Sequence, residues 1–343
     1  MSAQTDFSTR LIAWQKVYGR HDLPWQNTRD PYAIWVSEIM LQQTQVTAVI
    51  GYYQRFMQRF PSIKSLADAS QEEVLQYWSG LGYYSRARNL HNAAQTIMDE
   101  HGGKFPQDFE QIQTLSGIGR STAAAIASFA FNQNQTILDG NVKRVLARHY
   151  LIEGWTGTPK IEKQLWTLAE SLGPGQDMVA YTQGLMDLGA TICTPRAPLC
   201  SLCPIADACQ GRLAAESFPV KAPKLAKPHR QGRAWWIEAD GAVFLIRRPE
   251  KGLLGGMRAL PSCDWQGAEG APPLEGAWHR LGDVDHVFTH FRLTLGVDGL
   301  RLRDRPQMAL LGDWWPIDRL AEAGLPTVFN KAAQAAQKGM RIK

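Results

Sequence analysis

The chain has 343 residues, which is enough for about two domains of roughly 150 residues each. Apolar residues make up 44% and charged residues 20%, so a disordered or fibrous protein is excluded. The net charge is +5, and the basic residues between Val220 and Arg233 equal that surplus, so charge permits an anionic partner without indicating one. The longest apolar stretch, Ala123 to Phe131, is too short to cross a membrane. The first ten residues lack the features of a signal or transit peptide, so we expect the chain to stay where it is made.

Residues 1–211 predict helices throughout, which favours an all-α first domain. Apolar residues recur at steps of three to four from Trp35 to Phe60 and predict one long amphipathic helix that Pro61 ends. Six further segments have helical spacing: Leu66 to Trp78, Arg86 to His101, Thr122 to Phe131, Val142 to His149, Lys160 to Leu172, and Ala180 to Leu188.

The composition changes after Gln210. Residues 212–233 are basic and contain three prolines, which predicts a semi-rigid extended linker. A second domain, of the α+β class, is expected from 234 to 343. Aromatic and β-branched runs on either side of Asp240-Gly241 and of Asp298-Gly299 predict two hairpins. Helical patterns return only at Ile317 to Ala323 and near the C-terminus.

Four of the five cysteines lie within residues 193–209, in the spacing Cys-x6-Cys-x2-Cys-x5-Cys. An odd count, clustered in a chain without a signal, favours metal ligation over disulfides. Four thiolates this close can hold tetrahedral zinc or a 4Fe-4S cluster. Structural zinc sites usually use two separated pairs of ligands, so a single loop that supplies all four favours the cluster. The ligands would be Cys193, Cys200, Cys203 and Cys209.

Gly117 and Gly119 stand directly before an alanine-rich helix. Glycines can take positive φ and bring backbone amides close to a ligand, and the start of a helix adds partial positive charge. With a helix before it and Arg120 within it, this segment predicts a helix-hairpin-helix over residues 112–131 that binds the DNA backbone. A plain turn between helices is the alternative.

Two carboxylates are candidates for acid and base chemistry. Glu38 lies on the first long helix beside a run of amides, and Asp139 precedes a predicted helix. Considered alone, Glu38 is explained as a solvated charge and Asp139 as an N-cap. A catalytic interpretation is favoured only when the two carboxylates are considered together with the motifs around them.

The cysteine loop, Leu-Ser-Gly-Ile-Gly-Arg at 115–120 and Leu-Asp-Gly-Asn-Val-Lys-Arg at 138–144 together resemble the endonuclease III superfamily of base-excision DNA glycosylases. Within it, the motifs at 23–25, 37–46 and 80–90 are similar to those of MutY-type adenine glycosylases. The C-terminal half resembles their Nudix-like domain at 247–257 and 285–291. The resemblance implies an all-α helix-hairpin-helix glycosylase domain (1–211) with a 4Fe-4S loop, followed by an α+β Nudix-like domain (234–343).

The resemblance also implies roles for the matching residues. Glu38 would protonate adenine and then help to activate water, Asp139 would stabilise positive charge at the sugar C1′, and Asn141 would hydrogen-bond to the sugar. Adenine is a poor anionic leaving group, so the reaction needs one neutral acid beside one carboxylate. Trp25 and Leu41 would form an apolar pocket that raises the pKa of Glu38. Further positions expected to contact DNA are Gln43, Tyr83, Gly117, Gly119, Arg120, Ser121, Lys143, Thr289 and His290.

Several of these positions keep a second explanation. Gln43 and Tyr83 match residues that enter the base stack when a nucleotide is extruded, but Gln43 could be a surface amide and Tyr83 core packing. Lys143 could contact a phosphate or be a solvated charge. Superfamily members that also cut the strand use a lysine at the position of Ser121, so this chain is expected to release the base only.

The second domain is expected to read DNA rather than hydrolyse nucleotides. A working Nudix hydrolase needs a glutamate-rich helix, and no such string follows Gly256. The family's lesion-contacting triplet, usually Phe-Ser-His, is Phe288-Thr289-His290 here, which keeps the hydroxyl.

The sequence thus predicts a monofunctional adenine DNA glycosylase that acts on duplex DNA with adenine opposite 8-oxoguanine or guanine. We expect a monomer of the bacterial cytoplasm, associated with the nucleoid and not with a membrane. Two rivals remain: an endonuclease III-like glycosylase-lyase for oxidised pyrimidines, and a non-catalytic protein that binds damaged DNA.

Overall fold

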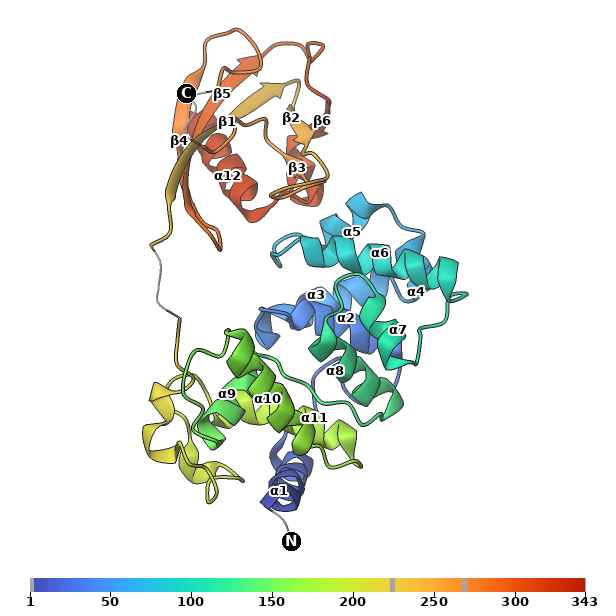
Figure 1. Cartoon of the computed structure of the whole chain (residues 1–343). Helices are drawn as coiled ribbons and strands as arrows, with labels where there is room; N and C mark the ends of the chain where they lie inside the picture. The colour runs from blue at the N-terminus through green and yellow to red at the C-terminus, as the bar shows by residue number, and fades with distance from the viewer. Residues whose placement is uncertain (1–2, 223–225, 267–269, 343) are drawn as a thin grey trace. The chain divides into compact units, whose positions relative to one another are not determined.

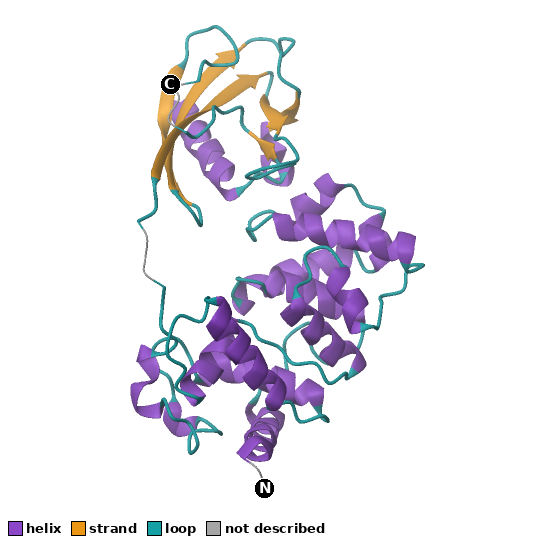
Figure 2. Cartoon of the chain, viewed as in Figure 1, coloured by secondary structure: helices purple, strands orange, loops and turns teal. Residues whose placement is uncertain are grey.

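The computed structural model describes residues 3–222, 226–266 and 270–342. The chain divides into two compact units: Met1–Asp68 with Asn89–Lys224, and Ala69–Arg88 with Leu225–Lys343. Helices form the first unit, and the second contains a sheet (Figure 2). This division differs from the expected domains because residues 69–88, from the helical half of the sequence, pack with the C-terminal part.

The first unit is all-α, as predicted. Its helices are α1 (Ala3–Tyr18), α2 (Pro31–Leu41), α3 (Val46–Arg59), α4 (Ile63–Ala67), the end of α6 (Ser85–Glu100), α7 (Phe109–Thr114), α8 (Arg120–Phe131), α9 (Gly140–His149), α10 (Pro159–Ser171) and α11 (Met178–Asp187). A π-helical turn at Leu188–Ile192 and 3₁₀ turns at Cys200–Leu202 and Arg212–Ser217 follow. Helix α2 packs against α3 and α8, and α1 packs against α11 (Figure 1). These contacts build a core with fully buried side chains such as Leu11 and Trp35.

The predicted single helix from Trp35 to Phe60 is wrong. The chain leaves helical geometry between α2 and α3, and Gln43 takes a φ of 55° there. Apolar spacing continues across the break because both helices bury one face, with Trp35 and Val49 at 0% exposure. Periodicity therefore could not reveal the interruption. The expected helix from Leu66 to Trp78 is likewise two helices, α4 and α5 (Gln71–Trp78).

The second unit is built on a mixed six-stranded sheet. Its strands are β1 (His229–Ala239), β2 (Ala242–Arg247), β3 (Arg258–Ala259), β4 (His279–Val287), β5 (Arg292–Leu302) and β6 (Gly312–Pro316). The order is β3-β2-β1-β5-β4, β6 pairs with β2, and β1 runs parallel to β5. Helix α12 (Thr327–Ile342) packs on the β4 and β5 side (Figure 1). A 3₁₀ turn lies at Ile317–Ala323, so both expected C-terminal helical segments are present.

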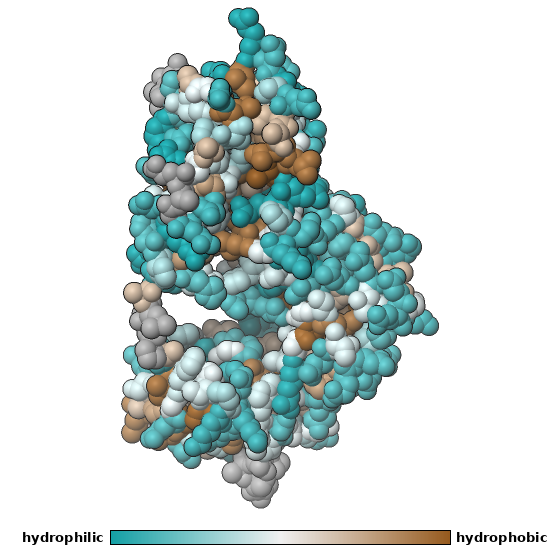
Figure 3. Space-filling view, turned by 45° about the horizontal axis from the view of Figure 1, so that its top comes forward, coloured by the Kyte–Doolittle hydropathy of each residue, from teal (hydrophilic) through white to brown (hydrophobic). Residues whose placement is uncertain are grey.

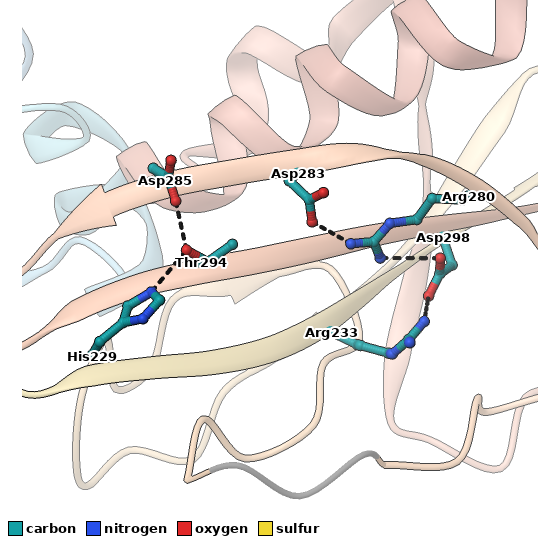
Figure 4. Close-up of polar contacts among 7 residues, drawn as sticks. All are labelled: His229, Arg233, Arg280, Asp283, Asp285, Thr294 and Asp298. Carbon is teal, nitrogen blue, oxygen red and sulfur yellow. Dashed lines mark hydrogen bonds and ion pairs between the residues drawn. The ribbon is translucent and has the colours of Figure 1, made fainter.

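One predicted hairpin is present and the other is not. Asp240 and Gly241 join β1 to β2 with φ values of 47° and 67°, as a tight two-residue turn requires. Strand β5 instead runs straight through Asp298-Gly299, so the second predicted hairpin is wrong. The Asp298 carboxylate accepts hydrogen bonds from Arg233 of β1 at 2.8 Å and Arg280 of β4 at 3.3 Å (Figure 4). Ion pairing across three strands therefore overrides the local turn preference of Asp-Gly.

The first strand begins earlier than expected. Strand β1 starts at His229, inside the segment 212–233 that the sequence predicts to be a linker. His229 Nε2 lies 2.9 Å from the Thr294 hydroxyl, which donates to Asp285 at 2.6 Å (Figure 4). Pro228 accepts a backbone hydrogen bond from Arg292 at 2.9 Å. The end of the predicted linker is therefore part of the sheet.

Helix α5 is attached to the C-terminal part of the second unit. The Glu72 carboxylate forms ion pairs with Arg247 of β2 and Arg258 of β3. Gln76 donates to the Glu322 carbonyl at 2.6 Å, and the Ser79 hydroxyl donates to the Leu325 carbonyl at 2.8 Å. These contacts join residues more than 170 positions apart, so local sequence patterns cannot predict them.

On the face drawn in Figure 3, hydrophilic residues predominate and hydrophobic ones form separate small patches. Among the described residues, no helix combines the length and apolar character that a membrane crossing requires.

Candidate active site

The first unit contains a cavity of about 460 Å³ that holds the Glu38 side chain. Its walls come from the segment between α1 and α2, from α2 itself, and from α8 and α11. Trp25 and Leu41 line it, as the sequence predicted, and Trp25 packs edge-on against Tyr53 at 5.4 Å. The cavity thus places the Glu38 carboxyl group among apolar and aromatic side chains.

Helix α2 fixes the position of Glu38. It begins with Pro31, and the Asp30 side chain caps it by accepting a hydrogen bond from the Tyr32 N–H at 3.0 Å. Burial raises the pKa of Glu38 to about 8, and the charge of Asp139 adds to this shift. The predicted rise in the pKa of Glu38 is therefore confirmed, with desolvation as its main cause.

Asp139 is the N-cap of α9. Its Oδ1 accepts from the Val142 N–H at 2.8 Å, so the capping interpretation is correct. Burial raises the pKa of Asp139, while hydrogen bonds from Val142 and Asn141 and the charge of Arg144 act in the opposite direction. These groups offset part of the effect of burial on the Asp139 carboxylate.

The beginning of α9 is held by contacts that require a glycine. Asn141 accepts from Arg144 Nη2 at 2.8 Å, and the same nitrogen donates to the Gly189 carbonyl at 2.6 Å. A Cβ at Gly189 would lie 2.6 Å from the Asn141 Cβ, so only glycine fits there. The Ser121 hydroxyl accepts from the Leu138 N–H at 3.0 Å, which fixes the backbone just before Asp139.

The predicted helix-hairpin-helix is formed by α7, the turn at 115–119 and α8. Gly117 has a φ of 80° and fits against Asn89, whose Cβ would be 2.7 Å from an added Cβ. Gly119 is the N-cap of α8 with a φ of −87°, so of these two glycines only Gly117 uses positive φ. An added Cβ at Gly119 would meet open space, so its backbone is accessible.

Two of the basic residues expected to contact DNA already have acidic partners. Arg120 forms an ion pair with Glu170 and lies over the Trp166 ring at 3.9 Å. Lys143 pairs with Glu162 at 2.6 Å. Both would have to exchange these partners to bind phosphate.

The two residues expected to enter the base stack share an unusual backbone. Gln43 and Tyr83 have φ values of 55° and 48°, a region that non-glycine residues seldom occupy. Gln43 is exposed in the first unit, and Tyr83, in the second, is 45% exposed. Exposure argues against core packing of Tyr83, and strain of this kind is concentrated at functional sites.

The four clustered cysteines line one small cavity, together with Arg148 and Arg212. Arg148 Nη1 donates to the Cys193 sulfur at 3.3 Å and to the Thr194 carbonyl at 2.7 Å. Within the described ranges, no three His, Cys, Asp or Glu side chains are arranged to hold a single metal ion.

In the second unit, Thr289 and His290 are exposed at the tip of the β4–β5 connection. The Phe288 N–H donates to the Phe291 carbonyl at 2.9 Å, and the two rings stack at 4.6 Å. Lys227 donates to the Phe288 carbonyl at 2.9 Å. The aromatic pair thus anchors the loop and leaves Thr289 and His290 pointing outward. The described residues between β3 and β4 form no helix, in agreement with the missing glutamate-rich string.

Sequence reasoning missed Arg20 and Gln183, which line the cavity with Glu38. Gln183 lies on α11, about 145 residues from Glu38, and no local pattern connects the two. For Arg20, the nearest sequence feature that could have drawn attention to this segment is the Leu-Pro-Trp motif at 23–25.

Family models match both halves of the chain. Residues 36–171 match the HhH-GPD superfamily base excision DNA repair protein model, and residues 233–335 match the NUDIX domain model. Adenine DNA glycosylase from Homo sapiens is 34% identical over 97% of this chain and 74% of its own length. Adenine DNA glycosylase from Buchnera aphidicola subsp. Schizaphis graminum is 34% identical over 95% of this chain and 97% of its own length.

Solved structures agree on the helical part. A thermostable thymine-DNA glycosylase matches with a TM-score of 0.55 and 30% identity, over 61% of this chain and 96% of that one. Endonuclease III in a non-covalent DNA complex matches with a TM-score of 0.51 over 62% of this chain and 98% of that one. Its identity is 20%, so this second match speaks for the fold alone.

The raised pKa of Glu38 predicts a pH-dependent loss of stability. Between pH 4.5 and about 8 the native state keeps a proton on Glu38 that the unfolded state releases. The free energy of unfolding therefore falls as the pH rises through this range. Glu38→Gln cannot release a proton, so its Tm should exceed that of the wild type increasingly from pH 5 to pH 8. Thermal denaturation across this range tests it, with exposed Glu153→Gln as the control. A constant Tm difference would contradict the assignment.

Proposed function

Because the chain belongs to the adenine DNA glycosylases of the HhH-GPD superfamily, we propose that it removes adenine paired with 8-oxoguanine or guanine without cutting the strand. The enzyme is a DNA glycosylase that hydrolyses an N-glycosidic bond in base excision repair of adenine mispairs.

One observation carries the proposal: Glu38 lies in a cavity with a pKa raised to about 8, within electrostatic reach of Asp139. A carboxyl group with this pKa keeps its proton near neutral pH and can act as a general acid. Asp139 would supply negative charge beside it, and hydrogen bonds from Val142 and Asn141 favour its ionised form. A proton donor beside an ionised carboxylate suits the cleavage of a base from a sugar.

The reaction divides into two proton transfers. Glu38 gives its proton to the adenine ring as the C1′–N9 bond breaks, and the bonding electron pair leaves with the neutral base. Asp139 stabilises the positive charge that develops at C1′, and Asn141, hydrogen-bonded to Asp139, contacts the sugar. The Glu38 carboxylate then takes a proton from the water that adds to C1′. The product is an abasic site in an intact strand.

The residue at position 121 argues against strand cleavage. A lyase of this superfamily needs an amine there to form a Schiff base, and the Ser121 hydroxyl instead binds the Leu138 N–H. This contact opposes the glycosylase-lyase rival. The pairing of Glu38 with Asp139 opposes a protein that only binds damage, because burying two nearby carboxyl groups is costly without a reaction that uses them.

Recognition of duplex DNA would use several elements of the chain. The turn at Gly117 and Gly119 offers backbone amides at the start of α8 for a phosphate. Extrusion of adenine is required because C1′ is inaccessible in a stacked duplex, and Gln43 and Tyr83 are exposed for that purpose. We further propose that the enzyme acts as a monomer on the nucleoid of a bacterial cytoplasm, which its Buchnera relatives support.

The loop of Thr289 and His290 would read the opposite base. In 8-oxoguanine, N7 is a hydrogen-bond donor, whereas in guanine it is an acceptor. A threonine hydroxyl can accept from the former. The loop tip is exposed and is held by the stacked rings of Phe288 and Phe291, which supports this role.

The cysteine loop would hold a 4Fe-4S cluster. Cys193, Cys200, Cys203 and Cys209 line one cavity, and four thiolates from a single loop suit such a cluster. When bound, such a cluster would supply structural crosslinking of the loop at 193–209. Arg196 on this loop would then lie near the DNA phosphates.

The first prediction from the proposed function concerns the reaction. On duplexes with adenine opposite 8-oxoguanine or guanine, wild-type enzyme should give strand breaks only after hot alkali. Glu38→Gln should lower the single-turnover rate by about 10²–10⁴-fold while DNA binding persists, and Glu153→Gln should behave as wild type. The wild-type rate should decline as the pH rises above about 8, where Glu38 loses its proton. Breaks without alkali would support the lyase, and no breaks the binder.

The second prediction concerns the lesion. Thr289→Ala with His290→Ala should reduce the preference for 8-oxoguanine over guanine by roughly fivefold for a lost hydrogen bond of about 1 kcal/mol. Single-turnover rates and affinities on both mispairs measure this ratio. The rate on the plain guanine mispair should remain close to wild type, since the chemistry lies in the other unit. An unchanged ratio would mean that the lesion is read elsewhere.

The third prediction concerns the cofactor. Protein purified without oxygen should be yellow-brown, with broad absorption in the blue and about four iron atoms per chain. Cys200→Ala should lose the colour and contain much less iron, while Cys263→Ala, outside the loop, should keep both the colour and the iron. Colourless protein with one zinc per chain would refute the cluster.

A further inference from the structure

Asp187, the last residue of α11, is a buried carboxylate that the proposed reaction does not use. Its side chain is 1% exposed and forms an ion pair with Arg20 Nε at 2.7 Å. The same oxygen, Oδ1, accepts from Gln183 Nε2 at 2.8 Å, and Oδ2 accepts from the Arg20 backbone N–H at 2.9 Å. Three donors hold this buried carboxylate in place, because the loss of any donor would leave the buried charge poorly compensated.

Both partners of Asp187 line the cavity that contains Glu38, whereas Asp187 stands behind them. Gln183 lies one helical turn before Asp187 on the same face of α11. Arg20 comes from the segment that follows α1. The carboxylate thus joins two walls of the cavity without touching its contents.

An ionised carboxylate only accepts hydrogen bonds, so it determines the orientation of the Gln183 amide. The amide nitrogen must face Asp187, and the amide oxygen is left for the cavity. Arg20 is oriented in the same way, since its Nε and backbone N–H are both engaged. The wall therefore presents one acceptor from Gln183 beside the remaining guanidinium donors of Arg20.

The backbone at Gly19 is shaped for this contact. A Cβ at Gly19 would lie 2.5 Å from the Gln15 carbonyl and 3.0 Å from Asp187 Oδ2. Only a glycine lets the chain after α1 approach closely enough for the Arg20 N–H to reach the carboxylate.

We propose that Asp187 is a positioning residue that sets the hydrogen-bond polarity of the base-binding cavity and thereby selects a 6-amino purine over a 6-oxo purine. This rests on the proposed function, in which the extruded base enters the cavity. Adenine carries a donor at position 6, which the fixed amide oxygen of Gln183 accepts. Hypoxanthine carries an oxygen there and meets the same acceptor, so it is disfavoured.

The test compares excision of adenine with excision of hypoxanthine, each opposite guanine, under single-turnover conditions. In Asp187→Asn the side chain can donate, so the Gln183 amide is free to turn its nitrogen toward the cavity. The ratio of adenine to hypoxanthine rates should fall on the order of tenfold, the equivalent of one hydrogen bond. A loss of folding alone would lower both rates and leave their ratio unchanged. Asp68→Asn, an exposed carboxylate paired with Lys64, is the matched control.

A second arm tests whether Asp187 acts through Gln183. Gln183→Ala should lower the ratio by a similar factor, and adding Asp187→Asn to it should change the ratio no further. If Asp187→Asn does not fold, an unchanged ratio in Gln183→Ala overturns the proposal by itself. A wild-type ratio retained in a folded Asp187→Asn does the same. Failure of the wild type to release adenine would instead overturn the proposed function.

Discussion

The proximity of two buried carboxyl groups is the constraint on which the first unit depends. Each carboxylate loses hydration when it is buried, and two negative charges near each other cannot both be held cheaply. Hydrogen bonds from Val142 and Asn141 and the charge of Arg144 offset part of the cost of burying Asp139. Burial and the charge of Asp139 both raise the pKa of Glu38, so Glu38 keeps its proton near neutral pH. The helix cap that stabilises α9 therefore also lowers the cost of burying the Asp139 carboxylate.

Close backbone approaches hold this arrangement in place. Gly189 lets the π-helical turn after α11 lie against Asn141, and Gly19 lets the chain after α1 reach Asp187. Both contacts meet the far end of α11, which supplies one wall of the cavity through Gln183. The end of α11 thus links the residues that would contact the sugar to those that would contact the base. Side-chain chemistry in this site depends on glycines that carry no chemistry of their own.

The second unit uses its sheet to present a loop. Polar side chains tie β1, β4 and β5 together across the strands, with Asp298 between Arg233 and Arg280 and with Thr294 between His229 and Asp285 (Figure 4). The loop between β4 and β5 follows directly from these strands, and the stacked rings of Phe288 and Phe291 lie at its two ends. A fold that matches the NUDIX domain model thus carries an exposed loop tip between two stacked phenylalanines.

The sequence by itself determined the helical half, the sheet-containing half and the Asp240-Gly241 turn, because spacing and turn residues are local. It also singled out Glu38 and Asp139 as candidate site residues, because the motifs that contain them are local. Only the tertiary structure decided that α2 ends before Gln43, since both flanking helices bury a face and keep one periodicity. It also decided that Asp298-Gly299 stays within a strand, because ion pairs from two neighbouring strands outweigh a local turn preference. The attachment of α5 to the C-terminal sheet, and the meeting of Arg20, Gln183 and Asp187, join residues more than 150 positions apart. Contacts over such distances follow from packing the whole chain, and no short pattern encodes them.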